Sequence, residues 1–433
     1  MEFHSQIVSL EKEERIGRFT EHRVRMIYIE FKLLPKIESY HNQRKEEQST
    51  VQIPCSQHWS KSFRDWSKLP EDMWVEILCR ISQKQVSRYK AVCMTWNHLI
   101  SNVCIPRLYL SSDIYGFLYN SKSEPLLSFR YNRPPRIPEL RPDDTCYQLI
   151  PSFPHIPYFL SYCNGMLLFN DSRILHFFVC NPAVNQCVTI PPCPDGCRNM
   201  QYSSLAFDLI RSIHFKLVCF HCEGSPITFY VFSSDSGRWD IHEVTFEHPA
   251  AMHRWYEHAV YSNGVLCYLS ESKHLVCLGI DRMNASAIDL PRKDTMELLG
   301  FIGESRGHLY HSNHDHSNIF FWMLEGCFET ARWICMLTIC IQDVVANPKV
   351  GNMLKHQGIS TFMPYALHPE ANIIFIGTHK NIIAYDYSAC ELRGLWKIKE
   401  FKSRALDQRT LWLYRQCFVN LKGLTRHHEP YYF

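Results

Sequence analysis

Two hydrophobic patterns divide this chain. Between residues 69 and 103, apolar side chains recur every three or four positions, as they do on one face of a helix. The first set consists of Met73, Ile77, Leu78 and Ile81, and the second of Tyr89, Val92, Cys93, Trp96, Leu99, Ile100 and Val103. We therefore predict two amphipathic helices joined by the short segment Ser82–Val86.

The expected helix starts have suitable residues. Pro70 suits the first helical position, and Glu71 and Asp72 lie where the helix dipole favours negative charge. Ser87 is a candidate cap for the second helix.

Past Pro106 the helical period is replaced by short apolar or alternating runs, which are typical of strands. These runs are Met166–Phe169, Leu175–Val179, Phe215–Phe220, Thr228–Phe232, Val265–Leu269, Ile373–Ile376 and Ile382–Tyr387. Turn pairs such as Asn164-Gly165, Ser236-Gly237 and Asn263-Gly264 separate them. The pattern predicts an all-β domain of roughly 300 residues.

A weak internal repeat favours one β architecture. The segments Cys163–Leu168, Ser262–Cys267 and Ser305–Tyr310 resemble one another, and their glycines, Gly165, Gly264 and Gly307, stand 99 and 43 residues apart. These spacings match two periods and one period of a four-stranded propeller blade. Residues 107–405 would then supply about six or seven blades. A two-sheet sandwich of this length would be unusual.

The chain is expected to have four parts. Residues 1–66 mix charges of both signs and are predicted to be partly disordered, residues 67–106 form the helical module, and residues 107–405 form the β domain. The tail 406–433 carries Leu411, Leu413, Tyr414, Phe418 and Leu421, which suggest a helix that closes the β domain. The fold class is therefore α+β multidomain, with a small all-α module before a large all-β, propeller-like domain.

Charge and cysteine content narrow the possible functions. Lys and Arg number 46 against 43 Asp and Glu, so the formal charge of +3 gives no footprint for nucleic acid or an anionic membrane. The longest strongly apolar run, Trp333–Ile341, is far shorter than the ~20 residues that cross a bilayer. No signal peptide opens the chain, and most of the 19 cysteines lie in apolar runs as small hydrophobic residues. A soluble protein of a reducing compartment, the cytoplasm or the nucleus, is expected.

Three clusters deserve comparison with metal sites. His311, His314 and His316, with Asp315, have a spacing that suits a transition metal, but they also suit a solvated hairpin loop between Leu309-Tyr310 and Ile319-Phe320. Cys193-x-x-x-Cys197, near Cys187, has no second Cys/His pair at zinc spacing and reads as a turn. Cys219-x-x-Cys222 lies in an expected strand, where alternation places the two sulfurs on opposite faces. The loop and core interpretations are favoured, and no metal is predicted.

The sequence contains none of the usual enzyme motifs. G-x-S-x-G, P-loop, G-x-G-x-x-G and H-E-x-x-H patterns do not occur. No catalytic residue and no cofactor are therefore predicted.

The helical module resembles the F-box. The matching segments run from Trp66 to Ile81 and from Val86 to Ile100, with Leu-Pro, an acidic turn, Glu-Ile-Leu, then Arg-x-x-x-Val-Cys-x-x-Trp and a closing Leu-Ile. Two positions depart from the pattern: Ile81-Ser82 replaces the usual Leu-Pro, and Met94-Thr95 replaces the usual basic residue. Neither change breaks the apolar faces.

The β region is similar to the F-box-associated domain of plant F-box proteins, a kelch-like propeller. The similar pieces are Cys180–Pro191, Leu205–Asp208, Phe215–Val218, Tyr230–Trp239, Asn263-Gly264, Phe321–Glu325, His368-Pro-Glu and Ile382–Asp386. Together the two resemblances cover about residues 67–390.

These resemblances imply a function. An F-box binds a Skp-type adaptor and, through it, a cullin–RING ubiquitin ligase, while the β domain binds a target protein without catalysing a reaction itself. The residues implied to contact the adaptor are Leu69, Pro70, Ile77, Leu78, Val92, Cys93 and Trp96. No substrate-binding residue and no target are indicated by the sequence.

Three alternatives remain open at this stage. In the first, the apolar faces of the helices pack on the chain's own β domain and bind no partner. In the second, the protein is a non-degradative F-box scaffold. In the third, it is a propeller hydrolase or a sugar-binding protein. No paired acids or triad in the sequence support the last of these.

Overall fold

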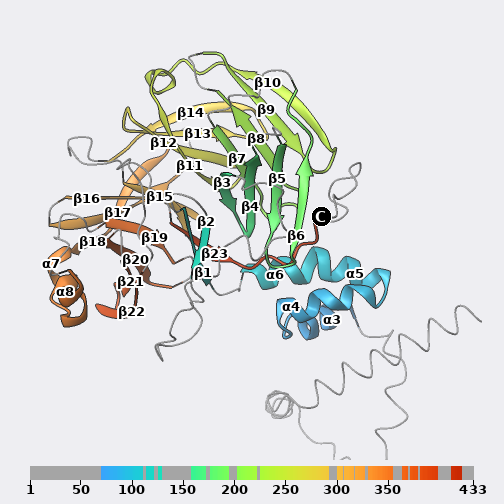
Figure 1. Ribbon diagram of the computed structural model, residues 1–433, viewed down its shortest axis with the longest axis horizontal. Helices are drawn as coiled ribbons and strands as arrows, with labels where there is room; N and C mark the ends of the chain where they lie inside the picture. Colours follow the sequence, from blue (N-terminus) through green and yellow to red (C-terminus); the bar gives the residue numbers. More distant parts are fainter. Residues whose placement is uncertain are drawn as a thin grey trace, which may run out of the picture. The chain divides into compact units, whose positions relative to one another are not determined.

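The protein is described by a computed structural model that covers residues 70–110, 114–120, 125–128, 158–171, 176–194, 202–221, 225–291, 300–305, 307–315, 317–326, 330–354, 363–368, 371–378, 381–397 and 411–421. The chain divides into two compact units, Met1–Leu110 and Ser111–Phe433. The described part of the first unit, residues 70–110, is helical, and the described part of the second is built almost entirely of strands (Figure 1). The predicted order of a small all-α module and a large all-β domain is therefore confirmed.

The helical unit consists of short helices. They are α3 (Glu71–Leu78), α4 (Gln83–Val86), the 3₁₀ helix η2 (Ser87–Ala91), α5 (Met94–Leu99), the π-helix η3 (Ile100–Cys104) and α6 (Ile105–Leu110). The first turn of α3 holds Glu71 and Asp72 as predicted, but Pro70, expected at the first helical position, is the N-cap residue just before the helix. The expected connection Ser82–Val86 is itself mostly the short helix α4.

The second predicted helix is interrupted. Cys93 has an extended backbone, with φ −160° and ψ 170°, and it caps α5, because its Sγ atom accepts a hydrogen bond from the Trp96 backbone N–H at 3.4 Å. Ser87 is therefore not the cap of one continuous helix, and it begins η2 instead. The helices also continue past Pro106, which lies in the first turn of α6, where its missing N–H is tolerated.

The β unit contains five four-stranded sheets, and each is a simple antiparallel meander. The first two are β3 (Tyr158–Cys163), β4 (Met166–Asp171), β5 (His176–Asn181) and β6 (Gln186–Ile190), then β7 (Tyr202–Ala206), β8 (Lys216–Phe220), β9 (Ile227–Ser233) and β10 (Arg238–Val244). The third comprises β11 (Trp255–Ser262), β12 (Val265–Ser270), β13 (His274–Gly279) and β14 (Asn284–Asp289). The fourth comprises β15 (Phe301–Ser305), β16 (His308–His314), β17 (Asn318–Glu325) and β18 (Arg332–Cys340), and the fifth β19 (Met363–Leu367), β20 (Ile373–Thr378), β21 (Asn381–Asp386) and β22 (Glu391–Lys397).

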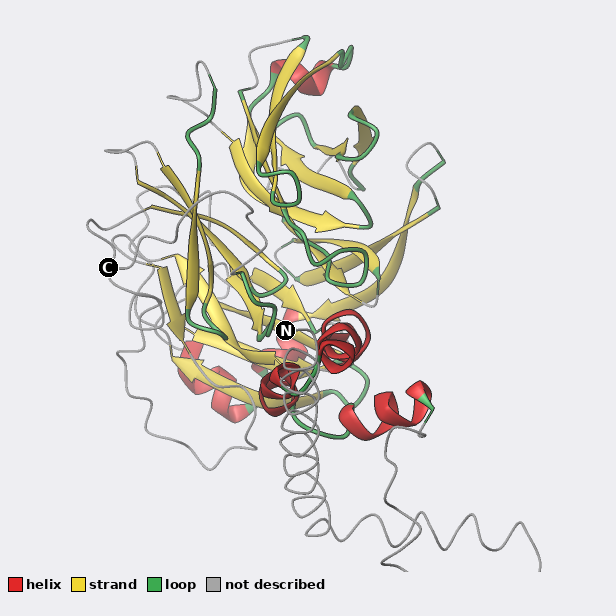
Figure 2. Ribbon diagram, turned by 90° about the vertical axis from the view of Figure 1, so that its right-hand side faces the viewer, coloured by secondary structure: helices red, strands yellow, loops and turns green. Residues whose placement is uncertain are grey.

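These sheets are the blades of a β-propeller. They follow one another around a common centre in chain order, from green through yellow to red in Figure 1, and strands make up most of the described unit (Figure 2). The short helices η6 (Pro249–Met252), α7 (Ile341–Val345) and α8 (Pro348–Leu354) lie in connections between strands. The described residues form five complete blades, where the glycine spacing predicted about six or seven.

A sixth, three-stranded sheet joins the two ends of the β unit. It has the order β2-β1-β23, with β1 (Ile114–Asn120), β2 (Pro125–Ser128) and β23 (Leu411–Arg415). The prediction of a helix in the C-terminal tail is wrong for this segment, because Leu411–Arg415 is a strand that pairs with β1. The expectation that the tail closes the β domain is confirmed.

The repeated Asn-Gly and Arg-Gly segments occupy equivalent turns. Gly165, Gly264 and Gly307 lie between the first and second strands of the first, third and fourth blades, with φ of 90°, 89° and 76°. The spacings of 99 and 43 residues therefore correspond to two blades and one blade, as predicted. Asn164 and Asn263 also have positive φ, as expected when two central residues form the tight hairpin turns that favour Asn-Gly.

The hydrophobic core lies between the blades. Tyr202, Phe220, Trp255 and Tyr268 pack together between the second and third blades. Similar clusters join the third blade to the fourth, the fourth to the fifth, and the three-stranded sheet to the fifth and first blades. Each blade is therefore stabilised mainly by its neighbours, since a single sheet cannot bury both of its faces.

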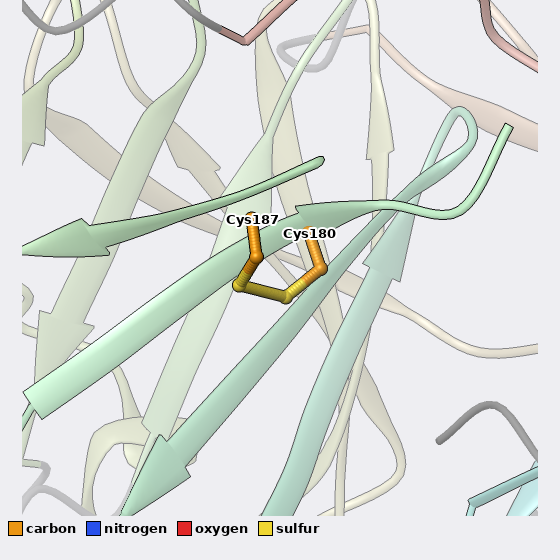
Figure 3. The surroundings of a disulfide bond; sticks show 2 residues. All are labelled: Cys180 and Cys187. Atoms are coloured by element: carbon orange, nitrogen blue, oxygen red, sulfur yellow. A yellow bond between two sulfur atoms is a disulfide. The ribbon is translucent and has the colours of Figure 1, made fainter. Parts of the chain in front are cut away.

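One cysteine pair was not predicted. Cys180 in β5 and Cys187 in β6 lie directly opposite each other and form a disulfide (Figure 3). The sequence interpretation treated cysteines as small hydrophobic residues, and it holds for Cys104, Cys163, Cys219, Cys267, Cys277 and Cys417, which are buried free thiols. Within the described part of the chain, no helix has the length and apolar character needed to cross a membrane.

The turn glycines yield a stability prediction. A Cβ atom on Gly165 would lie 2.5 Å from the Cys417 Cβ atom, whereas a Cβ atom on Gly307 would meet nothing within 4 Å. Gly307→Ala carries only the positive-φ cost of ~1–2 kcal/mol. Gly165→Ala adds overpacking, for a total loss of about 2–5 kcal/mol in the free energy of unfolding. Urea unfolding of both variants checks this, and equal losses would contradict the close approach of the C-terminal segment.

Candidate functional site

The helical unit contains the seven residues predicted to contact an adaptor, and their exposure differs. Leu69 lies outside the described residues. Pro70 and Cys93 are exposed, and Ile77 and Val92 are half-buried. Leu78 and Trp96 are buried, with 0% and 6% of their surface exposed. In this structure the last two offer little surface to a partner.

Trp96 packs against two other rings. Its ring centroid lies 4.9 Å from that of Trp74 and 6.4 Å from that of Tyr89, and both contacts are edge-to-face. Aromatic pairs of this geometry add to the stabilisation from burial. Trp96 therefore links α5 to α3 and η2, which fixes the positions of Pro70 and Cys93 at the starts of their helices.

Exposed apolar side chains extend this surface. Met94, directly after Cys93, is 89% exposed, Met73 is 45% exposed and Val103 is 38% exposed. Met94 occupies one of the two positions that replace the basic residue usual in the F-box pattern. Sequence periodicity could not identify these exposed positions, because it does not show which apolar side chains the short helices cover.

The β unit has its own candidate site, a cavity of about 130 Å³ on the axis of the propeller. It is lined by β3, β11, β15, β19 and β23, which are the innermost strands of five different sheets. We call this cavity the central channel. Its polar and aromatic lining residues are Tyr162, Asn164, His258, Tyr261, Phe301, Glu304, Trp412 and Arg415.

Two channel groups are held in their neutral forms by burial. Burial lowers the pKa of His258 to about 4, and its ring lies 5.1 Å from the ring of Trp412. Burial also raises the pKa of Tyr261 to about 12. Both side chains are therefore uncharged near neutral pH and can act only as neutral hydrogen-bonding groups.

Tyr162 connects two walls of the channel. Its hydroxyl donates to the Leu413 carbonyl and accepts from the Arg415 backbone N–H, both at 3.1 Å. Burial raises its pKa, so the hydroxyl keeps the proton that this pair of hydrogen bonds requires. Periodicity and motifs do not reveal this channel, because its residues come from strands that are far apart in the chain.

The predicted hairpin between Leu309-Tyr310 and Ile319-Phe320 is present, but His311 and His314 lie in strand β16 and not in a solvated loop. Asp315 accepts hydrogen bonds from the Ser317 and Asn318 backbone N–H groups at 2.8 and 2.7 Å, so its carboxylate stabilises the turn between β16 and β17. His311 is buried, His314 is half-buried, and His316 lies outside the described residues. Among the residues that the structure describes, no group of three or more His, Cys, Asp or Glu side chains could hold a metal ion.

The cysteine pairs considered for zinc are placed only in part. Cys219 is a buried free thiol in β8, and Cys193, which follows β6, is disulfide-bonded. Cys222 and Cys197, their predicted companions, lie outside the described residues. Cys187 forms the disulfide with Cys180 instead.

The placement of Trp96 predicts unequal effects of two neighbouring substitutions. Trp96→Ala removes both ring contacts and should cost about 3–5 kcal/mol, which is enough to unfold a small helical unit. Met94→Ala changes an exposed side chain and should cost less than ~0.5 kcal/mol. Limited proteolysis of the full chain, mapped by mass spectrometry, should show new cleavage within residues 70–110 only for Trp96→Ala. Equal protection of both variants would contradict a core role for Trp96.

A second prediction concerns pH and His311. Burial lowers the pKa of His311 to about 4, and its Nδ1 atom is buried with no hydrogen-bond partner among the described residues. Because the folded pKa lies below the unfolded value of ~6.5, the neutral form stabilises the fold above pH 6.5. This stabilisation is lost as the pH falls from 6.5 towards 4, by about 2–3 kcal/mol at pH 4.5.

Urea unfolding at pH 7.5 and 4.5 measures this loss. His311→Gln should retain a smaller pH-dependent loss than the wild type, since glutamine does not titrate. The exposed His308→Gln should behave as the wild type does. An unchanged pH dependence in His311→Gln would rule out this contribution.

Comparison with known proteins agrees with this geometry. Residues 66–108 match the F-box domain, and residues 146–420 match the family described as "F-box protein At3g26010-like, beta-propeller". The chain is 25% identical to F-box protein At3g49450 of Arabidopsis thaliana over 338 residues, which are 71% of this chain and 82% of that protein. It is 24% identical to the putative F-box/kelch-repeat protein At4g22430 of the same plant, over 72% of this chain and 76% of that protein. The chain belongs to the F-box proteins that carry an At3g26010-like β-propeller.

Proposed function

We propose that this F-box protein is the non-catalytic substrate receptor of a Skp–cullin–F-box ubiquitin ligase. The helical unit would bind a Skp-type adaptor, and the propeller would bind a target protein. The observation that carries the proposal is that one chain joins an F-box at residues 66–108 to a propeller at residues 146–420. This proposal places the protein in the cytoplasm, the nucleus or both.

The exposed apolar residues of the helical unit support the adaptor contact. Pro70, Cys93 and the flanking Met94 present apolar surface at the starts of α3 and α5, and Ile77 and Val92 are partly accessible. In this proposal these residues and Leu69 contact the adaptor. Leu78 and Trp96 then act from the interior, by holding the helices in place.

The mechanism requires no bond chemistry in this chain. Binding a target with the propeller and the ligase with the F-box brings the target's lysines to the ubiquitin-carrying enzyme at a high effective concentration. The same two contacts would also serve a non-degradative scaffold. Ubiquitylation of a bound target in a reconstituted ligase separates these two roles.

A charge-insertion variant tests the adaptor contact without weakening the helices. Pro70 and Cys93 are the N-cap residues of α3 and α5, and aspartate is among the preferred residues at that position. Pro70→Asp/Cys93→Asp therefore puts a capping side chain at both helix starts while it places two charges in the proposed interface. Binding of the co-expressed adaptor should weaken at least about tenfold, which corresponds to ~1.4 kcal/mol.

The matched control is Met252→Asp, at a side chain that is 78% exposed in the β unit. It should bind the adaptor as the wild type does. Either of two results would overturn the proposal: a folded wild-type chain that does not bind the adaptor, or a double variant that binds with unchanged affinity.

A further inference from the structure

The central channel contains hydrogen-bonding groups that the fold leaves unused. The Glu304 Oε1 atom accepts one hydrogen bond, from the Gly307 backbone N–H at 2.9 Å, and within the described part of the chain Glu304 forms no ion pair. The His258 ring nitrogens and the Tyr261 hydroxyl have no hydrogen-bond partner among the same described residues. A carboxylate, an uncharged imidazole and a phenol therefore line the same channel with free capacity.

Glu304 has an unfavourable electrostatic environment. The Glu304 residue is exposed, yet desolvation by the surrounding protein raises the pKa of its carboxyl, and the charge of Asp208 acts in the same direction. The Gly307 N–H, Arg415 and His308 act against this shift but do not cancel it. The ionised carboxylate would consequently be stabilised by an additional positive charge brought into the channel.

Arg415 does not supply that charge as a paired partner of Glu304. It lies on β23, its backbone N–H is bound by Tyr162, and it already has another interaction in the structure. Its positive charge is near enough to lower the pKa of Tyr162 and of Glu304, which opposes the effect of burial in both. The carboxylate is nevertheless left without an ion pair in the described part of the chain.

The rest of the wall suits a cation with an apolar stem. Tyr162, Tyr261, Phe301 and Trp412 contribute aromatic rings, and Ile302 and Leu367 contribute aliphatic surface. The faces of aromatic rings attract ammonium and guanidinium groups, and long basic side chains pack their methylene stems on apolar walls. The volume of about 130 Å³ is well below the ~300–1,000 Å³ of a drug-sized ligand site, so it fits one side chain better than a whole molecule.

We propose that the central channel binds one basic side chain, lysine or arginine, of the protein that the propeller recognises, with Glu304 as its counter-ion. This inference rests on the proposed receptor function and specifies the chemistry of the target. The ammonium or guanidinium group would lie against the Glu304 carboxylate, and His258 and Tyr261 would accept further hydrogen bonds. The aromatic rings would surround the stem.

Other ligand classes fit the channel less well. An acidic side chain would bring a second negative charge to Glu304, which has no ion pair with any described residue. A purely apolar side chain would remove water from the carboxylate without replacing its hydrogen bonds, which is costly. A basic group both donates hydrogen bonds to the Glu304 carboxylate and supplies the opposite charge.

Binding of short blocked peptides by the full chain tests the proposal. Four peptides differ only in their central residue, which is lysine, arginine, norleucine or glutamate, and the intrinsic fluorescence of the protein is measured up to millimolar peptide. Trp412 in the channel wall provides a local reporter. The lysine or the arginine peptide should bind at least about tenfold more tightly than the norleucine peptide, which has the same length without the charge. Equal signals from the basic and norleucine peptides, including no binding by either, would overturn the proposal.

Two matched variants then locate the binding. Glu304→Gln keeps an acceptor for the Gly307 N–H but removes the charge, so it should fold and lose at least about tenfold in affinity for the basic peptide. Glu243→Gln removes an exposed carboxylate from the outer strand β10 and should bind as the wild type does. Urea unfolding of both variants confirms that they are folded. A folded Glu304→Gln that retains full affinity would refute the role of Glu304.

Adaptor binding is measured on the same preparations. A chain that binds the adaptor but does not prefer basic peptides refutes the channel inference and leaves the receptor function intact. A chain that prefers basic peptides but does not bind the adaptor supports the channel site and refutes the ligase role.

Discussion

The closure of the propeller by the C-terminal strand is the interaction on which the β unit depends. β23 pairs with β1, and the residues after it run along the first blade, where the Asn181 side-chain amide donates to the Cys417 and Val419 carbonyls at 2.8 Å each. Without this sheet, the apolar faces of the fifth and first blades would be exposed to water. β1 and β23 are separated by about three hundred residues in the chain, so their pairing closes a very long loop. The entropic cost of closing this loop is offset only when the ring of blades is complete.

The same closure creates the central channel. β23 supplies Trp412 and Arg415 to its wall, and the two hydrogen bonds of the Tyr162 hydroxyl hold β23 against β3. The innermost strands therefore have a fixed spacing, and several of their polar side chains face a shared space. Burial there favours the uncharged forms of His258 and Tyr261, and desolvation raises the pKa of the Glu304 carboxyl although that residue is exposed. A propeller opened at this sheet would keep its individual blades but would lose the electrostatic character of its axis.

The helical unit divides its few apolar residues between two tasks. A segment of this length can form only a small hydrophobic core. Leu78 and Trp96 are buried in that core, while Pro70, Cys93 and Met94 are exposed at helix starts. Cys93 serves both tasks, since its sulfur caps α5 while the residue remains accessible. The break in the helix at Cys93 is what separates these roles, because a continuous helix would have placed Val92, Cys93 and Trp96 on one face.

The sequence by itself determined the two units, the blade spacing and the most buried strands. All seven predicted strands correspond to β4, β5, β8, β9, β12, β20 and β21, which are second or third strands of their blades. Most of those strands are covered by neighbouring blades on both faces and are continuously apolar, although β9 alternates, whereas inner strands such as β3 and outer strands such as β10 carry mixed patterns. Only the tertiary structure decided the strand at Leu411–Arg415, the disulfide, the division between buried and exposed F-box residues, and the channel around Glu304. Each of these features depends on contacts between residues that are far apart in the chain. A periodic pattern shows only which face of one helix or strand is apolar, and it does not show which residues of other elements contact that face.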